Sequence, residues 1–134
     1  MVLLFEWPLN KDFSRVIYPR KSKARIIAAL LFEKFKKNQG FMSKHKVSEF
    51  CSDVQTGKYL WRNAEFKASR KYVYAILKGL VKMGMVQFRV GRVGSDWRQG
   101  YFLEFTEFEK RLLIISRRWR KEFVKDTKLK NKGG

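Results

Sequence analysis

Cysteine and histidine are scarce in this sequence of 134 residues, and their scarcity excludes several kinds of site. Cys51 is the only cysteine and His45 is the only histidine. With a single cysteine the chain can form neither an internal disulfide nor a cysteine-based zinc cluster, which fits a reducing compartment. We therefore expect a cytoplasmic protein, associated with the nucleoid if the organism is a prokaryote, that holds no metal and no cofactor.

Long hydrophobic runs are also missing. The longest uninterrupted apolar stretch, Ile26 to Phe32, is far shorter than the roughly 20 residues that span a bilayer. The apolar run at the N-terminus ends at Glu6 and is too short for the core of a signal peptide. The sequence predicts a protein that neither spans a membrane nor carries a visible secretion signal.

Motifs typical of catalysis are absent too. The sequence contains neither a phosphate-cradling Gly-x-x-x-x-Gly-Lys-Ser/Thr motif nor a dinucleotide fingerprint. His45 and Cys51 have no third residue whose placement would orient a catalytic pair, so His45 is better explained as a surface residue. Of the neighbouring acids Glu104, Glu107 and Glu109, a capping box and the helix dipole account for two. We predict no catalytic residues and no enzyme; a metal-dependent nuclease is the least favoured alternative.

Positive charge dominates what is present. The chain has 31 Lys and Arg against 12 Asp and Glu, a net charge of +19, in a composition that is 45% hydrophobic and 16% aromatic. Such an excess attracts polyanions, with nucleic acid as the first candidate partner and an anionic membrane surface as the second. A basic protein without a specific partner is the simpler alternative, but self-repulsion of this size opposes compaction unless a partner neutralises it.

The first half of the chain reads as an arm followed by helices. Residues 1–20 contain both prolines and show no sustained period, so we expect an extended N-terminal arm. Ser22 is a candidate N-cap for a helix with apolar residues at helical spacing. A short strand at residues 41–42 and a second helix, capped by Ser43 or Ser48, follow. Residues 58–67 fit either a packed helix or a long aromatic loop.

The most informative segment is a basic amphipathic helix that begins after Ser69, a good N-cap, and ends near Gly84. Its apolar residues share one side at 100° per residue, which predicts a core face. Four polar residues gather roughly 140° away: Arg70, Lys71, Tyr74 and Lys78. Such residues can reach phosphates or guanine edges in a major groove, although an ordinary solvated face is the alternative.

A β-hairpin with a basic tip follows this helix. Residues 85–90 and 101–106 are predicted strands, and the glycine-bounded stretch 91–100 is a predicted turn region. Long loops that carry cations are often functional when a rigid scaffold displays them, although a mere connection is the alternative. The candidate binding residues of the hairpin mix cations with an aromatic ring: Arg89, Arg92, Trp97 and Arg98.

This order of elements resembles the winged helix-turn-helix family, with residues 69–86 similar to its recognition helix and the start of its wing. The ending Leu-Val-Lys-Met-Gly-Met-Val at residues 80–86 is typical of that junction. The resemblance covers about residues 22–106. It implies a mostly helical α+β fold, with a winged-helix domain at residues 21–106. It also implies that the helix, from Ser69 to Lys78, enters the major groove while the hairpin contacts flanking backbone or minor groove.

One segment departs from the family pattern. The stretch between the second helix and Ser69 is longer than the usual tight turn. Either the second helix is residues 57–66, with an additional helix before it, or the chain carries an insertion there. The angle at which the basic helix would dock depends on which of the two holds.

A long C-terminal helix is predicted for residues 107–124, beginning at a capping box made by Thr106 and Glu109. Its apolar residues form one stripe, typical of a helix packed along a groove. Leu113 and Ile114 lie off that stripe and form either a homodimer interface or a contact with the N-terminal arm. The Lys-rich residues 125–134 are predicted to be a disordered basic tail that adds affinity for a phosphate backbone.

Three functions follow from these features. The leading hypothesis is a regulator of transcription that binds double-stranded DNA, without a membrane partner. The second is an RNA-binding or ribosome-associated module with the same fold. The third is a protein-interaction winged helix within a replication or transcription assembly.

Overall fold

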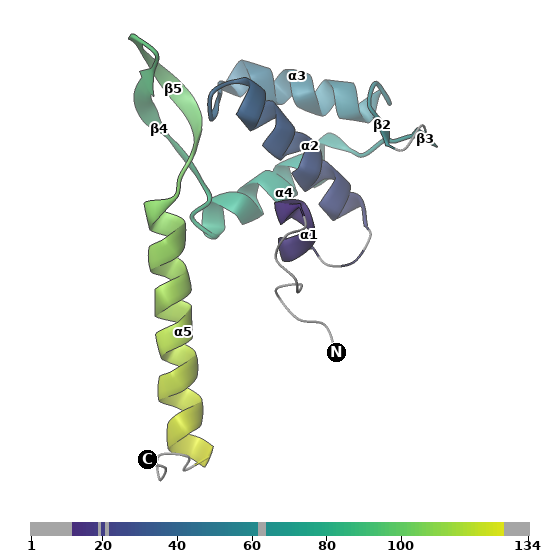
Figure 1. The fold of residues 1–134 in the computed structure, drawn as a ribbon. Coiled ribbons are helices and arrows are strands. Elements are labelled where there is room, and N and C mark those ends of the chain that lie inside the picture. The colour runs from purple at the N-terminus through teal and green to yellow at the C-terminus, as the bar shows by residue number, and fades with distance from the viewer. Residues whose placement is uncertain (1–11, 19, 21, 62–63, 128–134) are drawn as a thin grey trace.

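The computed structural model describes residues 12–127 except 19, 21, 62 and 63. It is an α+β fold, about 59% helical, with a small three-stranded antiparallel sheet (Figure 1). The elements in chain order are α1 (Phe13–Ile17), α2 (Lys23–Lys37), β1 (Phe41–Met42), α3 (Lys44–Gln55), β2 (Leu60–Trp61), β3 (Ala64–Glu65), α4 (Arg70–Lys82), β4 (Val86–Val93), β5 (Asp96–Leu103) and α5 (Thr106–Thr127).

Serine side chains begin the three helices that build the core. Ser22, Ser43 and Ser69 are the N-caps of α2, α3 and α4. Each hydroxyl accepts a hydrogen bond from the backbone N–H three residues later, at 3.3, 3.1 and 3.2 Å respectively. This satisfies a donor that a helix start otherwise leaves unpaired. The predicted caps Ser22 and Ser69 are confirmed, and the structure selects Ser43 over Ser48.

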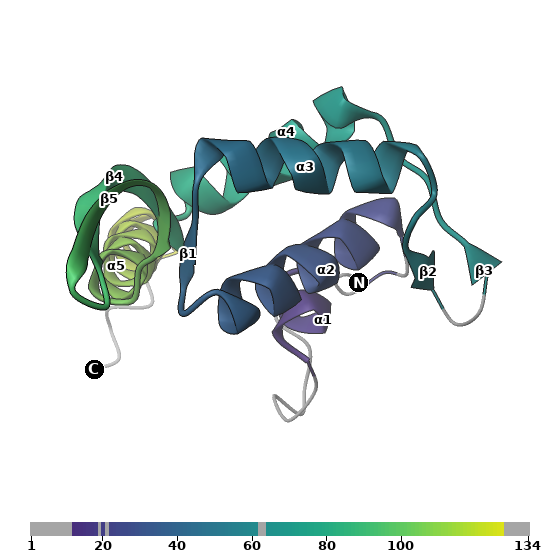
Figure 2. The ribbon, with the colours of Figure 1, turned by 90° about the horizontal axis from the view of Figure 1, so that it is seen from above.

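The apolar sides of these three helices form the core. One cluster joins residues that are essentially inaccessible to solvent: Ile27, Leu31, Phe35, Val47, Phe50, Val54, Val73, Leu77 and Leu80. Each such side chain contributes about 1.5–3 kcal/mol by leaving water. The predicted core face of the basic helix is therefore confirmed. Seen from above, the β4–β5 hairpin and the β2–β3 ribbon lie at opposite ends of this core (Figure 2).

The three-stranded sheet has the order β1-β5-β4 and rests on the core only at its root. Val86 pairs with Leu103, and Met42 pairs with Tyr101. Val86 and Met42 are buried, whereas the outer half of the hairpin stands clear of the helices. The hairpin is thus a projecting ribbon with an anchored base.

The turn of this hairpin is much shorter than the sequence predicts. Strand pairing continues to Val93 and Asp96, so that only residues 94 and 95 form the turn, with Gly94 at φ 65°. The predicted turn region 91–100 is therefore wrong. Gly91 and Gly100 lie within the strands, where the backbone is crowded: a Cβ on Gly100 would lie 2.7 Å from the Met42 carbonyl oxygen.

Two further segments differ from expectation. The arm predicted as extended contains a helix, α1, whose Val16 is buried and whose Phe13 ring packs edge-on against Phe32 of α2; residues 1–11 lie outside the described part. The described residues of the stretch 58–67 form no helix. They contain the β2–β3 ribbon, with Phe66 buried in the core. The long connection before α4 therefore holds this ribbon, and α3 is the second core helix.

The C-terminal helix projects from the domain and does not pack along it. Every residue from 113 to 123 is exposed, and α5 points away from the core (Figure 1). The described residues form no groove along its stripe, and most of the arm that was one predicted contact of Leu113 and Ile114 lies outside the described part. The helix continues to Thr127, which corrects the start of the predicted tail; residues 128–134 lie outside the described part. Within the described residues, no helix combines the length and the apolar character needed to cross a membrane.

Candidate nucleic-acid interface

Helix α4 presents a row of lysines to solvent. Lys71 and Lys78 are exposed, as predicted, and Lys82 extends the same row by one turn. Ala75 lies between Lys71 and Lys78 and is also exposed. Its small side chain lets a ligand approach the backbone of α4 closely at the middle of the row. Lys82 was missed by the sequence prediction, although its spacing of four residues from Lys78 places it on the same helix face.

Arg70 does not belong to this lysine row. Its guanidinium donates to the hydroxyls of Ser48 at 3.2 Å and Ser52 at 3.0 Å, and to the Ser48 carbonyl at 3.4 Å. These three bonds join the first turn of α4 to α3. The predicted groove-reading arginine is therefore engaged within the domain, where it positions the helix.

Ser69 and Tyr74, the other predicted residues of this segment, also make contacts within the domain. The Ser69 hydroxyl caps α4 through Tyr72 N–H. Tyr74 is half-buried against the core cluster, near Tyr101 of β5. Burial raises the pKa of the Tyr101 hydroxyl, and the neighbouring Tyr74 adds to this shift, so Tyr101 stays neutral at ordinary pH. Tyr74 therefore lies where α4 meets the hairpin.

The hairpin carries an exposed aromatic face, which we define by Phe88, Val90, Arg92 and Trp97. The strand register pairs Arg92 with Trp97 and Phe88 with Tyr101, and directly opposed residues project from the same face. Trp97 is 67% exposed and Val90 57% exposed. The Arg92 guanidinium lies 5.4 Å from the Trp97 ring centroid, a cation–π arrangement that holds both groups at the tip.

Arg89 and Arg98 occupy the opposite face of the hairpin. Arg89 lies 4.2 Å above the Phe102 ring and 3.6 Å from a Glu104 carboxylate oxygen, so its charge is already partnered. It sits in mid-strand opposite Gly100 and not at the tip. Arg98 is exposed beside Asp96 near the turn. The four predicted hairpin residues thus divide between two faces, with Arg92 and Trp97 together on the aromatic one.

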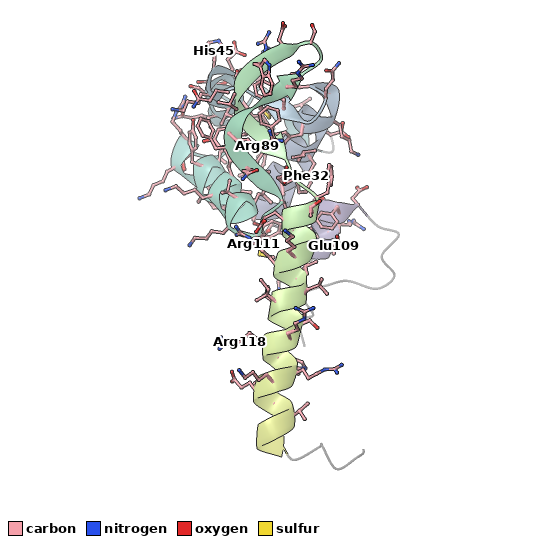
Figure 3. The ribbon with its side chains drawn as sticks, turned by 90° about the vertical axis from the view of Figure 1, so that its left-hand side faces the viewer. Phe32, His45, Arg89, Glu109, Arg111 and Arg118 are labelled. Carbon is pink, nitrogen blue, oxygen red and sulfur yellow. The ribbon has the colours of Figure 1, made fainter. Side chains whose placement is uncertain are left out.

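The aromatic face adjoins the helices that carry the exposed lysines. Lys44, the first residue of α3, places its Nζ 5.3 Å from the Phe88 ring centroid, while Phe88 packs edge-on against Tyr101. Figure 3 views the molecule from its hairpin side, with α4 on the left of the hairpin and Phe32 of α2 on the right. The lysine row, Lys44 and the aromatic face therefore lie around one junction. Lys44 and Phe88 could not be found from the sequence, because only the fold brings α3 to the hairpin.

The residues considered for catalysis do not meet. His45 is 80% exposed at its side chain and pairs with Glu49 at 3.2 Å, which confirms it as a surface residue. Cys51 is fully buried, and burial raises the pKa of its thiol, an effect that Arg70 partly opposes. Among residues 12–127 that the structure describes, no group of three His, Cys, Asp or Glu side chains is placed to hold a metal ion.

Comparisons with protein-family models, with curated proteins and with solved structures found no match to this chain.

Proposed function

We propose that this chain is a winged-helix protein that binds double-stranded DNA in the cytoplasm and regulates transcription, without acting as an enzyme. The order α2-β1-α3-α4-β4-β5, with the sheet order β1-β5-β4, supports the proposal because it matches the order of elements on which the resemblance to that family rests. The observation that carries the proposal is the exposed lysine row of α4 beside the aromatic face of the hairpin.

In this proposal α4 enters the major groove with its lysine row toward the DNA. Lys71, Lys78 and Lys82 contact phosphates as point charges, and Ala75 offers an apolar contact to a thymine methyl. Lys44, beside the aromatic face, and Arg92, within it, bind the flanking backbone. Arg70 sets the angle of α4 through its bonds to α3. The charge of +19 speeds the encounter.

The test compares two triple variants that lose the same charge. Lys71, Lys78 and Lys82 are replaced by Ala in one, and the exposed lysines Lys23, Lys36 and Lys37 of α2 in the other. Duplex affinity is titrated over a range of salt concentrations. We expect the α4 variant to lower the slope of log K against log salt by up to about 3, roughly 0.9 per phosphate contact. Equal losses in both variants would show that only net charge matters and would refute the interface.

A second candidate function rests on the exposed rings of the hairpin. Trp97 and Phe88, at 67% and 37% exposed, can stack on unpaired bases, as in proteins that bind single strands or RNA. Trp97→Ala would then weaken binding to single-stranded RNA more than binding to duplex DNA, and Trp97→Phe would retain most of the affinity. Tighter binding of the unmodified protein to structured RNA than to any duplex would favour this second function.

A further inference from the structure

The apolar stripe of α5 is exposed along a helix that projects from the domain. Ile115 is 53% and Trp119 66% exposed. The start of the helix is anchored to the domain: Phe108 packs against Phe13, and the Arg111 guanidinium donates to the Lys82 carbonyl of α4. Helices in proteins gain most of their stability from packing of an apolar side. A helix of 22 residues with its stripe in water therefore indicates a missing partner.

An apolar groove at the base of α5 continues this stripe. It measures about 490 Å³ and lies between α1, α2, the end of β5 and the start of α5. Phe108 belongs to both the groove wall and the stripe, and Phe105, just before α5, lines the groove and is 75% exposed. The charged residues of the groove lining are three acids, Asp12, Glu33 and Glu104, and one base, Lys36, so the groove is acidic on balance in a strongly basic protein, although Glu104 also pairs with Arg89. The occupant that this surface fits is thus a helix with apolar residues flanked by cations.

The end of α5 itself has that chemistry. We propose that α5 pairs in antiparallel orientation with α5 of a second copy of this chain. The stripe residues Phe108, Leu112, Ile115 and Trp119 are spaced by four, three and four residues, which reads the same in both directions. In the antiparallel register Phe108 faces Trp119 of the second copy, and Leu112 faces Ile115. A two-fold axis then crosses the helices between residues 113 and 114, as an isologous dimer requires.

Charge supports this orientation over the parallel one. The first turn of α5 is acidic, with Glu107 and Glu109, whereas Arg118 and Arg120 lie near its end. The same register brings Glu109 level with Arg118 of the second copy, and Glu107 level with Arg120. The far end of each helix then reaches the acid-flanked groove of the other copy. A parallel pair would instead set the basic ends side by side, which is unfavourable.

The size of the surface is in the range of a stable interface. Phe105 and Trp119, 75% and 66% exposed, are aromatic, and such side chains bury about 150–250 Å² when covered completely. With the aliphatic residues of the stripe and the groove they form a continuous apolar surface, and standard interfaces bury roughly 800 Å² per partner. Pairing would also place the two α4 lysine rows in a symmetric relation. The inference nevertheless does not depend on the proposed function, since it concerns the free protein.

The proposed dimer is tested by the same substitution at two neighbouring isoleucines of α5. Ile115 lies on the stripe and Ile114, 58% exposed, lies on the far side of the helix. The mass in solution of the full chain, measured by sedimentation without nucleic acid, is expected to be that of a dimer. Ile115→Glu should weaken the dimer by roughly 100-fold or more, because it buries a carboxylate from each copy, whereas Ile114→Glu should leave it intact. A monomeric unmodified chain, or equal effects of the two variants, would overturn the proposal.

Orientation is tested by disulfide formation between single-cysteine variants. Leu112→Cys and Ile115→Cys are made in a Cys51→Ser background, then oxidised separately and as a mixture. We expect the mixture to give a crosslinked heterodimer efficiently, because Leu112 faces Ile115 of the second copy. Efficient crosslinking of either variant alone, without the mixed product, would indicate a parallel pair and overturn the antiparallel arrangement. Loss of DNA binding in other variants leaves these results unaffected, so the two proposals fail separately.

Discussion

Arg70 lies in the first turn of α4, and its guanidinium bridges to α3 through Ser48 and Ser52. On a helical wheel it belongs with the polar residues, as Lys71 does, but the two side chains have different surroundings. Lys71 is exposed, whereas Arg70 is half-buried and hydrogen-bonded. The same contrast separates Arg92, at the tip of the hairpin, from Arg89, which is held between Phe102 and Glu104. Binding and positioning are thus divided among neighbouring cations.

Replacing Arg70 with Met should therefore lower the stability of the fold. We expect a loss of about 1–2 kcal/mol in the free energy of unfolding, because hydrogen bonds from a charged group to the Ser48 and Ser52 oxygens disappear. Lys71→Met is the matched control and should change stability by less than about 0.5 kcal/mol. Urea denaturation followed by circular dichroism measures both. Similar stabilities for the two variants would show that the Arg70 bonds contribute nothing to joining α3 and α4.

At the scale of elements, the hairpin depends on close approach between strands. Gly100 of β5 lies where the Met42 carbonyl and the Phe41 ring of β1 leave no room for a side chain. The sheet thereby holds the root of the hairpin against the core while its aromatic face extends beyond it. Helix α4, by contrast, contains Gly79 at a position where a Cβ would meet no atom within 4 Å.

Alanine at these two glycines should have opposite effects. Gly100→Ala should destabilise the fold by about 2–3 kcal/mol, because its Cβ would overlap backbone atoms that cannot move aside easily. Gly79→Ala should stabilise it by about 0.5–1 kcal/mol, since alanine restricts the unfolded chain and suits a helix interior. Thermal unfolding of both variants gives the comparison. A neutral Gly100→Ala would mean that β1 does not approach β5 as closely as described.

At the scale of the whole molecule, repulsion among the positive charges destabilises the folded state. With a net charge of +19, the 31 Lys and Arg far outnumber the 12 Asp and Glu, and the described ion pairs are largely between exposed side chains. Such pairs contribute little to stability. Anything that screens or neutralises the positive charge should therefore favour the folded state.

Sodium chloride should accordingly raise the melting temperature of the free protein. Relief of about 1 kcal/mol of repulsion corresponds to an increase of roughly 4 °C for a domain of this size. Differential scanning calorimetry at low and moderate salt measures the shift, with sucrose as an uncharged control. A duplex should raise the melting temperature at low salt and lose this effect as salt increases. A melting temperature that falls with salt would show that ion pairs outweigh repulsion.

Much of the fold was predictable because it depends on neighbours in the chain. Capping by Ser22 and Ser69, the core face of α4, the strand at residues 41–42 and the hairpin all follow from local spacing and composition. The hairpin turn was misplaced because Gly91 and Gly100 are typical of turns in sequence but serve close packing between strands here. Of the candidate site, the sequence identified Lys71, Lys78, Arg92 and Trp97 as polar or aromatic surface.

The sequence by itself determined the strong positive charge and the starts of α2 and α4, because charge is additive and helix-capping signals are local. Tertiary structure decided which cations are available. Contacts between residues far apart in the chain engage Arg70 and Arg89, bring Lys44 to Phe88, and leave the stripe of α5 exposed beside an acid-flanked groove. Such contacts depend on the packing of three helices around one core, which no local pattern encodes.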